Sequence, residues 1–421
     1  MQASPRLLLR RRFLPLFATQ FLGAFNDNLY KTAMVLLVTY HIYSDESREA
    51  AFNALAGALF ILPFFLFSAI AGQLADGHDK ARIIRIVKTA EIAIMVFGAA
   101  GLLFHSVPLL LAALFAMGVH SSFFGPIKYA ILPQHLRSEE VLGGTGLVEA
   151  GTYGAILLGT IVGGIIPPPV SAGLVLFVAV AGWLTGRAVP PAPPGAATPP
   201  VDHHIIRASI ALVRQTMHIP RLFLAIMAIS FFWAVGAVLA AQFPPLVKNV
   251  LVADQTVATL MLALFSVGVA IGSVLINRLL KGKVSARFAP VSALLMGAFV
   301  LDLWWVTSHW QEHGGDLQDL MTFLRQPGAY RVVVDLFGVA VAGGMFVVPL
   351  YAFLTTTVPA SETARTIAAN NIVNSGAMVI GALLAAGMAL AGMGVAQILL
   401  LVAFGSAGAA IIAQRLHRAC D

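Results

Sequence analysis

Apolar stretches long enough to cross a lipid bilayer recur along the whole chain, and they decide the fold class. A helix needs about 20 apolar residues to span the roughly 30 Å hydrocarbon core of a bilayer. Only 11% of the 421 residues are charged, against about 25% in soluble proteins. The sequence therefore predicts an all-α membrane protein. Its twelve transmembrane helices are expected at 13–40, 52–75, 83–104, 107–132, 142–166, 171–188, 221–246, 255–280, 286–308, 330–357, 366–391 and 393–413.

Basic residues set the expected orientation, because Lys and Arg stay on the cytoplasmic side of a membrane. With the N-terminus inside, most of the 26 basic residues fall in cytoplasmic segments, Lys80 and Lys88 among them. The protein is therefore expected in a bacterial inner membrane, with both termini in the cytoplasm. The net charge of +7 requires no nucleic-acid partner, since this asymmetry and anionic lipid account for it.

A proline-rich segment, VPPAPPGAATPP at 189–200, separates two groups of six expected helices. Its proline density disfavours helix and predicts an extended tether. Apolar residues then recur at helical spacing beside basic ones, which indicates either an interfacial amphipathic helix or an ordinary cytoplasmic connector. These residues are Ile205, Ile206, Ile210, Val213, Arg207, Arg214 and His218. The expected domains are an N-terminal six-helix bundle at 1–188, the cytoplasmic linker with this helix at 189–220, and a C-terminal six-helix bundle at 221–421.

The two halves look like distant copies of each other. GVHSSFFGPIKYAILP in the first half corresponds to GGMFVVPLYAFLTTTVP in the second, which aligns Pro126 with Pro349 and Lys128 with Tyr351. Parallel repeats of six helices are typical of two-bundle transporters, whose substrate cavity lies near the midplane where the bundles meet.

Polar residues inside the first apolar stretch are the main candidates for a site: Asn26, Asp27, Asn28 and Lys31. A charge at the centre of a spanning helix costs roughly 2.5–3.5 kcal/mol on insertion scales, so it marks a functional-site hypothesis. Asp27 lies about 14 residues into this helix, roughly 21 Å along its axis. Lys31 comes at i+4, within reach of Asp27. Asp27 and Lys31 either contact a substrate or ion, or neutralise each other as a packing pair between helices.

Other polar residues extend this set. Lys128 lies between Pro126 and Pro133, where it either attracts an anionic phosphate or reaches for the interface. Glu149 is a candidate for pairing with Lys128 or Lys31, or for gating and proton coupling. The expected amide face and aromatic wall comprise Asn370, Asn371, Asn374, Phe21, Phe25, Phe124, Phe232, Trp233 and Tyr351. Glu91, Asp302 and Asp335 are expected to be structural acids nearer helix ends.

GQLADGHDKAR at 72–82 resembles the cytoplasmic motif of the major facilitator superfamily. There, Gly permits close helix approach and Asp with Arg forms a charge-dipole latch that holds one conformation. The residues expected to form it here are Gly72, Asp76, Lys80 and Arg82. Gly77 replaces the usual basic residue after the Asp, so the latch is expected to be weaker or to use Arg82. The second half has Ile276 where the Asp would fall.

Enzyme chemistry has no visible basis in this sequence. Zinc-ligand spacing, a nucleotide loop and a serine elbow are all missing, and the single cysteine is Cys420. An acyltransferase HxxxxD motif needs an Asp five residues after its His, but Leu110 follows His105 and Gly125 follows His120 at that spacing. We therefore expect neither an enzyme nor a cofactor or metal site.

Four strings resemble the lysophospholipid transporter family within the major facilitator superfamily: FLPLFATQFLGAFNDNLYK, FFGPIKYAILPQHL, LVEAGTYGAILLGTIVGG and FVVPL. The resemblance covers essentially the whole chain, and it looks closest to transporter domains that are fused elsewhere to a lysophospholipid acyltransferase. It implies a major facilitator fold and a flippase working by alternating access with lateral opening. Such proteins move lysophosphatidylethanolamine and lysophosphatidylglycerol from the outer to the inner leaflet for reacylation, here with a separate cytoplasmic acyltransferase as partner.

When the roles of family residues are transferred to matching positions, the resemblance implies headgroup contacts in this chain. The residues are Asp27 with Asn28, Lys128, Asn371 and Asn374. One departure is that related transporters tend to have a basic residue after the FW pair of the seventh helix, where this chain has LAAQF. Gln242 is expected to be a weaker substitute. The alternative function is a proton-coupled exporter of amphipathic drugs or other small molecules, with Asp27 or Glu149 as the proton carrier.

Overall fold

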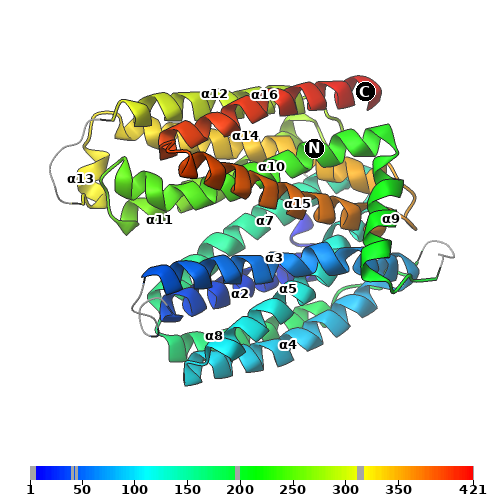
Figure 1. The fold of residues 1–421 in the computed structure, drawn as a ribbon. Coiled ribbons are helices and arrows are strands. Elements are labelled where there is room, and N and C mark those ends of the chain that lie inside the picture. The colour runs from blue at the N-terminus through cyan, green and yellow to red at the C-terminus, as the bar shows by residue number, and fades with distance from the viewer. Residues whose placement is uncertain (1–5, 39–41, 43–45, 195–199, 311–316, 421) are drawn as a thin grey trace. The chain divides into compact units, whose positions relative to one another are not determined.

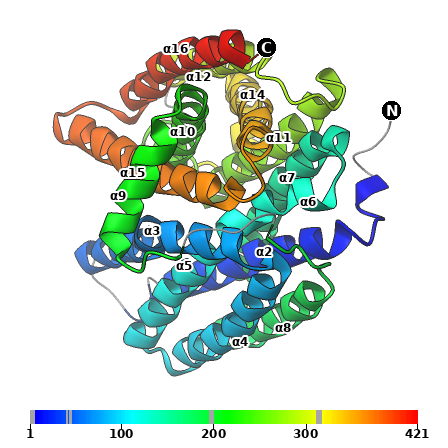
Figure 2. The same cartoon turned by 90° about the vertical axis from the view of Figure 1, so that its right-hand side faces the viewer.

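The computed structural model describes residues 6–38, 42, 46–194, 200–310 and 317–420, most of which lie in long helices (Figures 1 and 2). The helices of the first half are α2 (Leu14–Leu37), α3 (Glu46–Gly77), α4 (Lys80–Phe104), α5 (Val107–Ala130), α6 (Leu132–His135), α7 (Ser138–Ile165) and α8 (Pro168–Arg187). The remaining helices are α9 (Ile205–Met217), α10 (Pro220–Asn249), α11 (Gln255–Leu279), α12 (Ala289–Ser308), α13 (Leu320–Leu324), α14 (Ala329–Thr356), α15 (Thr363–Leu390) and α16 (Val395–Cys420).

The expected all-α membrane architecture is confirmed. Among the described residues, 11 helices are long and apolar enough to cross a membrane. Helix α2 has 24 residues and is also long enough, but its polar residues dilute its hydropathy, and it is not among the 11. The expected helices agree with the observed ones to within a few residues over most of the chain, as for 107–132 against Val107–Ala130.

Local sequence explains several helix starts and some irregularities. Asp79 accepts a hydrogen bond from the Ala81 amide at the start of α4, and Asp254 caps α11 in the same way through Thr256. Proline occurs in the first turn of α5, α8 and α10, where its missing N–H costs nothing. Pro63, Pro126 and Pro349 lie inside α3, α5 and α14, where each removes one helical hydrogen bond.

The chain divides into two compact units. Unit 1 comprises Met1–His218 and Leu354–Ser375, and unit 2 comprises Ile219–Phe353 and Gly376–Asp421. In unit 1, α2 packs on α7 and α8, α3 packs on α5 and α9, and α4 packs on α5 and α8. In unit 2, α16 packs on α10 and α12. The sequence-based boundaries at 188 and 221 remain a prediction.

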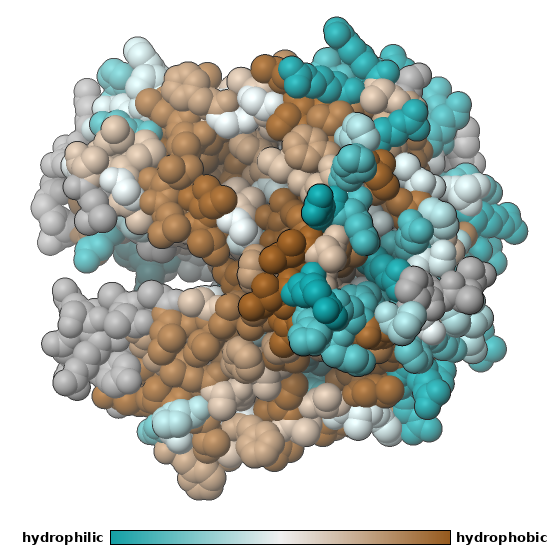
Figure 3. Space-filling model, turned by 45° about the vertical axis from the view of Figure 1, so that its right-hand side comes forward, coloured by the Kyte–Doolittle hydropathy of each residue, from teal (hydrophilic) through white to brown (hydrophobic). Residues whose placement is uncertain are grey.

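Apolar side chains cover the outside of the helices as well as the interior. Tyr30 and Met34 of α2 are fully buried in the core of unit 1, where the Tyr30 hydroxyl donates to the Leu110 carbonyl at 3.0 Å. On the outside, Phe97 and Phe104 of α4 and Phe177 of α8 are exposed. Figure 3 shows brown, hydrophobic side chains along the helix sides and teal, hydrophilic ones at the end where α9 lies. Such an exterior suits lipid better than water.

The first part of the proline-rich linker is not helical, as expected, but it is anchored rather than free. The Ala192 amide donates to Asp79 Oδ1 at 2.9 Å, and the Lys80 amide donates to the Ala192 carbonyl at 3.0 Å. The Gln134 side chain donates to the Pro193 carbonyl at 3.4 Å, and Val189 is buried. Residues 195–199 lie outside the described part of the chain, so the extended tether stays a prediction for that portion of the linker.

Asp79→Ala is expected to release this linker. The variant removes the N-cap of α4, which is typically worth about 1 kcal/mol, and the acceptor for the Ala192 amide. Hydrogen exchange at the Ala192 amide of the purified protein should then be faster, because this amide loses its acceptor. Asp254→Ala is the matched control, since it removes an N-cap that has no linker contact. Equal exchange at Ala192 in both variants would contradict the anchoring role.

Candidate functional site

The polar residues of α2 point in different directions and do not form one site. Asn26 is fully buried, and its amide donates to Glu91 Oε1 at 3.2 Å. Asp27 is half-buried, and its Oδ2 accepts a hydrogen bond from the Ser121 hydroxyl at 2.9 Å. Asn28 donates to the Ala24 carbonyl one turn earlier, at 2.8 Å. The predicted cluster therefore divides into an inner part at Asn26 and an outer part at Asp27.

The inner part belongs to a buried ionic cluster on α2, α4 and α5. Lys88 and Glu91 form an ion pair, and His120 Nε2 lies 3.1 Å from Glu91 Oε2. All three side chains, with Asn26, are buried. A buried charge is tolerated only when it is paired and hydrogen-bonded, so each charged member of this cluster depends on the others.

Sequence reasoning missed this cluster. It assigned Lys88 to a cytoplasmic segment and Glu91 to the neighbourhood of a helix end, whereas both lie well inside α4. Their separation of three residues places them on one helix face, and that spacing was the available signal. His120 was considered only as a catalytic candidate, and nothing in its local sequence connects it with Glu91.

The outer part borders a line of residues on α5. Ser121, Gly125 and Lys128 recur at i, i+4 and i+7, which places them on one helix face; we call them the α5 stripe. Ser121 binds Asp27 of α2. A Cβ atom added at Gly125 would lie 3.1 Å from the side-chain nitrogen of Asn371 on α15. The α5 stripe thus brings three of the sequence-predicted residues, Asp27, Lys128 and Asn371, to one side of unit 1.

Opposite charges meet along the α5 stripe. Lys128 interacts electrostatically with both Glu149 and Asp27. Its ammonium also lies 4.8 Å from the centroid of the Tyr129 ring. Glu149 is buried and accepts a hydrogen bond from the Tyr129 hydroxyl. Among the described residues Glu149 and Lys128 form no ion pair at contact distance, and the direct partner of Glu149 is Tyr129, which the sequence did not indicate.

Lys31 does not form the i+4 ion pair with Asp27 that the sequence suggested. Among the described residues its ammonium has no carboxylate at ion-pair distance, although the charge of Asp27 acts on it from further away. Instead it lies 5.7 Å from the centroid of the Phe60 ring. Phe60 and Phe64 of α3 pack edge to face at 5.9 Å, and Phe64 approaches Gly125. Aromatic surface therefore flanks the polar α5 stripe.

The remaining candidates divide between the two units. On α15, Asn370 and Asn374 are buried, while Asn371 is half-buried beside α5. In unit 2, the Trp233 indole donates to the Tyr351 hydroxyl at 2.8 Å, and Phe232 packs on Trp233 with ring centroids 5.9 Å apart. Gln242 is half-buried on α10. Trp233 and Tyr351 are thus a hydrogen-bonded pair.

The latch motif contacts the start of α15. Asp76 is fully buried and accepts hydrogen bonds from the backbone amides of Ala364 at 2.9 Å and Arg365 at 3.0 Å. This places a carboxylate at a helix N-terminus, where the helix dipole favours it. The nearby guanidinium is that of Arg365, with Nε 3.9 Å from Asp76 Oδ2, and Arg82 is exposed. The guanidinium beside Asp76 is thus that of Arg365 and not the expected Arg82, and Lys80 is buried near Asp76. The latch itself remains a prediction.

Gly72 permits the close approach of α3 and α15. A Cβ atom at this position would lie 2.6 Å from Ala368 Cβ and 2.9 Å from the Ala364 carbonyl oxygen. Real Cβ atoms do not approach other atoms so closely, so only glycine fits without movement of α15.

Comparison with known proteins gives a consistent family and fold. The profile of the Major Facilitator Superfamily matches residues 16–382. The lysophospholipid transporter LplT of Serratia proteamaculans (strain 568) is 27% identical over 358 residues, covering 82% of this chain and 80% of that protein. LplT of Yersinia pestis (strain Pestoides F) is also 27% identical, over 354 residues, with 82% and 79% covered.

Solved structures show the same fold at low sequence identity. The human organic anion transporter MFSD10 (TETRAN) superposes with a TM-score of 0.82 at 13% identity, covering 96% of this chain and 99% of that one. A single-residue variant of the E. coli fucose:proton symporter FucP gives a TM-score of 0.69 at 12% identity, covering 96% and 98%. The expected major facilitator fold is confirmed.

Proposed function

Because the chain belongs to the major facilitator superfamily of transporters, we propose that it carries lysophospholipids from the outer to the inner leaflet of a bacterial inner membrane. It is a multi-pass membrane protein and a transporter, not an enzyme. In this proposal it works by alternating access with lateral opening, and a separate acyltransferase in the cytoplasm reacylates the delivered lipid. The 27% identity to LplT proteins supports this cargo over other small molecules.

The observation that carries the proposal is the chemistry along the α5 stripe. A lysophosphatidylethanolamine headgroup has an ammonium and a phosphate a few bonds apart. The carboxylate of Asp27 suits the ammonium, and the ammonium of Lys128 suits the phosphate. Asn371 offers an amide that hydrogen-bonds to phosphate or glycerol oxygens. Gly125 has no side chain, and this lets the Asn371 amide approach α5 between Ser121 and Lys128.

The aromatic surface beside the stripe fits the other end of such a lipid. Moving a sixteen-carbon chain fully into water would cost on the order of 12 kcal/mol at about 0.8 kcal/mol per methylene, so the chain has to remain in an apolar environment. Phe60 and Phe64 border the polar side chains and provide such a surface. The headgroup alone then needs polar contacts.

Asp27→Asn and Lys128→Ala are expected to lower lysophosphatidylethanolamine uptake by at least about ten-fold each. Loss of one charged hydrogen bond is worth about 1.5–3 kcal/mol, which corresponds to roughly 10- to 150-fold. The measurement is uptake of the labelled lipid into proteoliposomes that contain equal amounts of folded protein. Lys283→Ala is the control, because it removes an exposed lysine from the segment between α11 and α12, which belongs to unit 2.

Two outcomes would overturn this assignment. If both variants transport as fast as the unmodified protein, the α5 stripe does not bind the headgroup. If the unmodified protein moves no lysophospholipid but exports amphipathic cations when a pH gradient is imposed, the cargo is wrong and the chain is a proton-coupled exporter.

A further inference from the structure

Helix α9 presents an apolar surface that the described part of the chain leaves exposed. One face packs on α3 and α15 and contains the buried residues Ala208, Ser209, Leu212 and Thr216. Figures 1 and 2 show α9 crossing these two helices. Beside the packed face, Ile206 and Ile210 lie one turn apart and are 70% and 64% exposed. Two large exposed isoleucines on a helix already packed on its other side indicate contact with something outside the protein.

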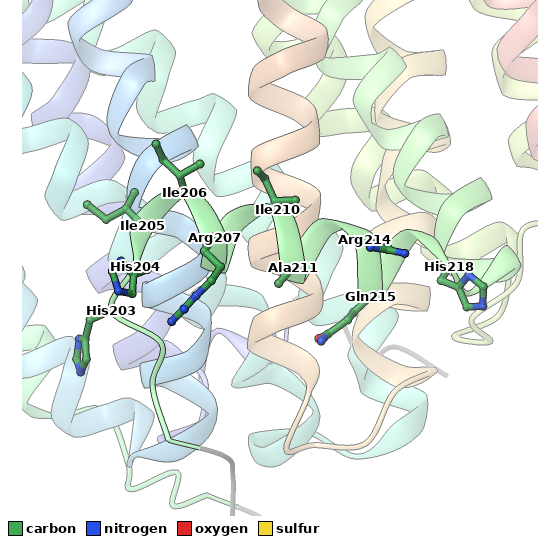
Figure 4. Close-up of a pocket in the computed structure, with 10 residues that line it drawn as sticks. All are labelled: His203, His204, Ile205, Ile206, Arg207, Ile210, Ala211, Arg214, Gln215 and His218. Carbon is green, nitrogen blue, oxygen red and sulfur yellow. The ribbon is translucent and has the colours of Figure 1, made fainter.

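A basic face adjoins the exposed isoleucines. Arg207, Arg214 and His218 recur at i, i+7 and i+11. In Figure 4, Ile206 and Ile210 extend to one side of α9 and Arg207 extends to the other. These residues line an open groove of about 1350 Å³, together with His203, His204, Ile205, Ala211 and Gln215. Apolar and basic groups in this arrangement are typical of helices that lie in the membrane interface.

The position of α9 along α3 agrees with a location at the membrane interface. The Asp202 amide, just before α9, donates to the side chain of Gln73 at 2.8 Å, and Gln73 is in the last turn of α3. Ala208 and Leu212 pack with Ala69, which lies eight residues before the end of α3 at Gly77. Eight helical residues span roughly 12 Å. Helix α9 therefore lies level with the end of a membrane-spanning helix, where headgroups meet acyl chains.

The charges of this region leave one arginine available to an anion. Arg207 donates to both carboxylate oxygens of Asp202, at 2.8 and 3.0 Å. These hydrogen bonds, with one from the His204 amide, lower the pKa of Asp202 to about 2, so that this carboxylate stays ionised and holds Arg207. Arg214 is exposed, and among the described residues it has no carboxylate partner. His218 lies one turn away on the same face.

We propose that α9 binds an anionic phospholipid of the adjacent leaflet, with Arg214 on the phosphate and Ile206 and Ile210 among the acyl chains. Charge complementarity selects this occupant, because the groove is basic beside an apolar surface and a membrane is the environment of the helices around it. This lipid is a bound neighbour and not the transported cargo. The inference therefore goes beyond the proposed function and holds for any cargo.

Depth measurements test the apolar half of the proposal. In a Cys420→Ser background, which removes the single cysteine, Ile206→Cys, Ile210→Cys and Gln215→Cys each receive a fluorescent label in the full-length protein. Vesicles contain phosphatidylcholine and phosphatidylglycerol. Labels at 206 and 210 should be quenched by lipids with a spin label on the acyl chain, and the label at 215 by aqueous iodide. Equal iodide quenching at all three positions would show that α9 lies in water and would sink the proposal.

Lipid binding tests the basic half. Native mass spectrometry of the full-length protein, titrated with phosphatidylglycerol, should show roughly five-fold weaker retention in Arg214→Gln, because one arginine near an anionic surface contributes about that factor. Arg137→Gln is the matched control, since it removes an exposed arginine from the same end of unit 1 but not from α9. Equal losses in the two variants would mean unspecific attraction. Displacement of the lipid by equimolar inorganic phosphate would mean a free-anion site, and either result overturns the proposal.

Discussion

Lys88→Met should destabilise the protein by about 3–5 kcal/mol, the usual cost of removing one partner of a buried ion pair. Among the described residues, the variant leaves His120 and Asn26 as the polar contacts of the buried Glu91 carboxylate. We expect a low yield of monodisperse protein and a midpoint of thermal unfolding in detergent that falls by many degrees. Fluorescence-detected size exclusion after heating measures both.

The double variant Lys88→Met with Glu91→Gln is the decisive control. It removes both charges and leaves an uncharged amide that still hydrogen-bonds to Asn26, so it should recover much of the lost stability. Non-additivity of this kind is the mark of a direct pair. If the double variant were as unstable as the sum of the two single variants, the ion pair would not be the source of the effect.

Gly72→Ala should force α3 and α15 apart. The new methyl group would meet Ala368 Cβ and the Ala364 carbonyl, and overpacking of this kind costs about 1–3 kcal/mol. The two amides that Asp76 holds would then exchange with deuterium faster, because their acceptor moves away. Hydrogen-exchange mass spectrometry of the first turns of α15 measures the exchange rate of these amides. We also expect lysolipid uptake by this variant to fall.

The same helix provides the control for this substitution. At Gly57 of α3, no atom of the described residues outside the local helix backbone lies within 4 Å of the position that a Cβ would occupy. Gly57→Ala should therefore leave the exchange of α15 unchanged, and it should stabilise α3 slightly through the higher helix propensity of alanine. If both variants speed exchange at Ala364 and Arg365 equally, close packing at Gly72 is not what holds α15.

Most of the fold was predictable because a bilayer imposes simple rules. Each spanning helix needs a certain apolar length, and the start of the expected helix at 107–132 coincides with that of α5. Its end was set two residues too late, because Ile131 is apolar although the helix ends at Ala130. The linker illustrates what composition leaves out. Proline content predicts extended backbone but not the hydrogen bonds that anchor Ala192 to Asp79.

The candidate site was predictable in its residue types but not in its partners. Asp27 and Lys128 were identified because charges in apolar helices are costly. Ser121 and Gly125 of α5 connect them. Neither residue stands out in the sequence, because the sequence does not tell which face of α5 meets α2 and α15. The same limitation concealed Tyr129 as the donor to Glu149 and Arg365 as the neighbour of Asp76. Long-range contacts of this kind are set by helix packing rather than by local spacing.

The capping of α15 by Asp76 has a consequence for the alternating-access cycle proposed above. The amides of Ala364 and Arg365 receive their acceptor from α3, nearly 290 residues away in sequence. When α3 and α15 separate, both hydrogen bonds to the Asp76 carboxylate break, and the two amides and the carboxylate each need a new hydrogen-bond partner. Water is the available replacement. Separation of the two helices and entry of water at this end are therefore a single event, so the opening rate should slow when osmolytes lower the activity of water.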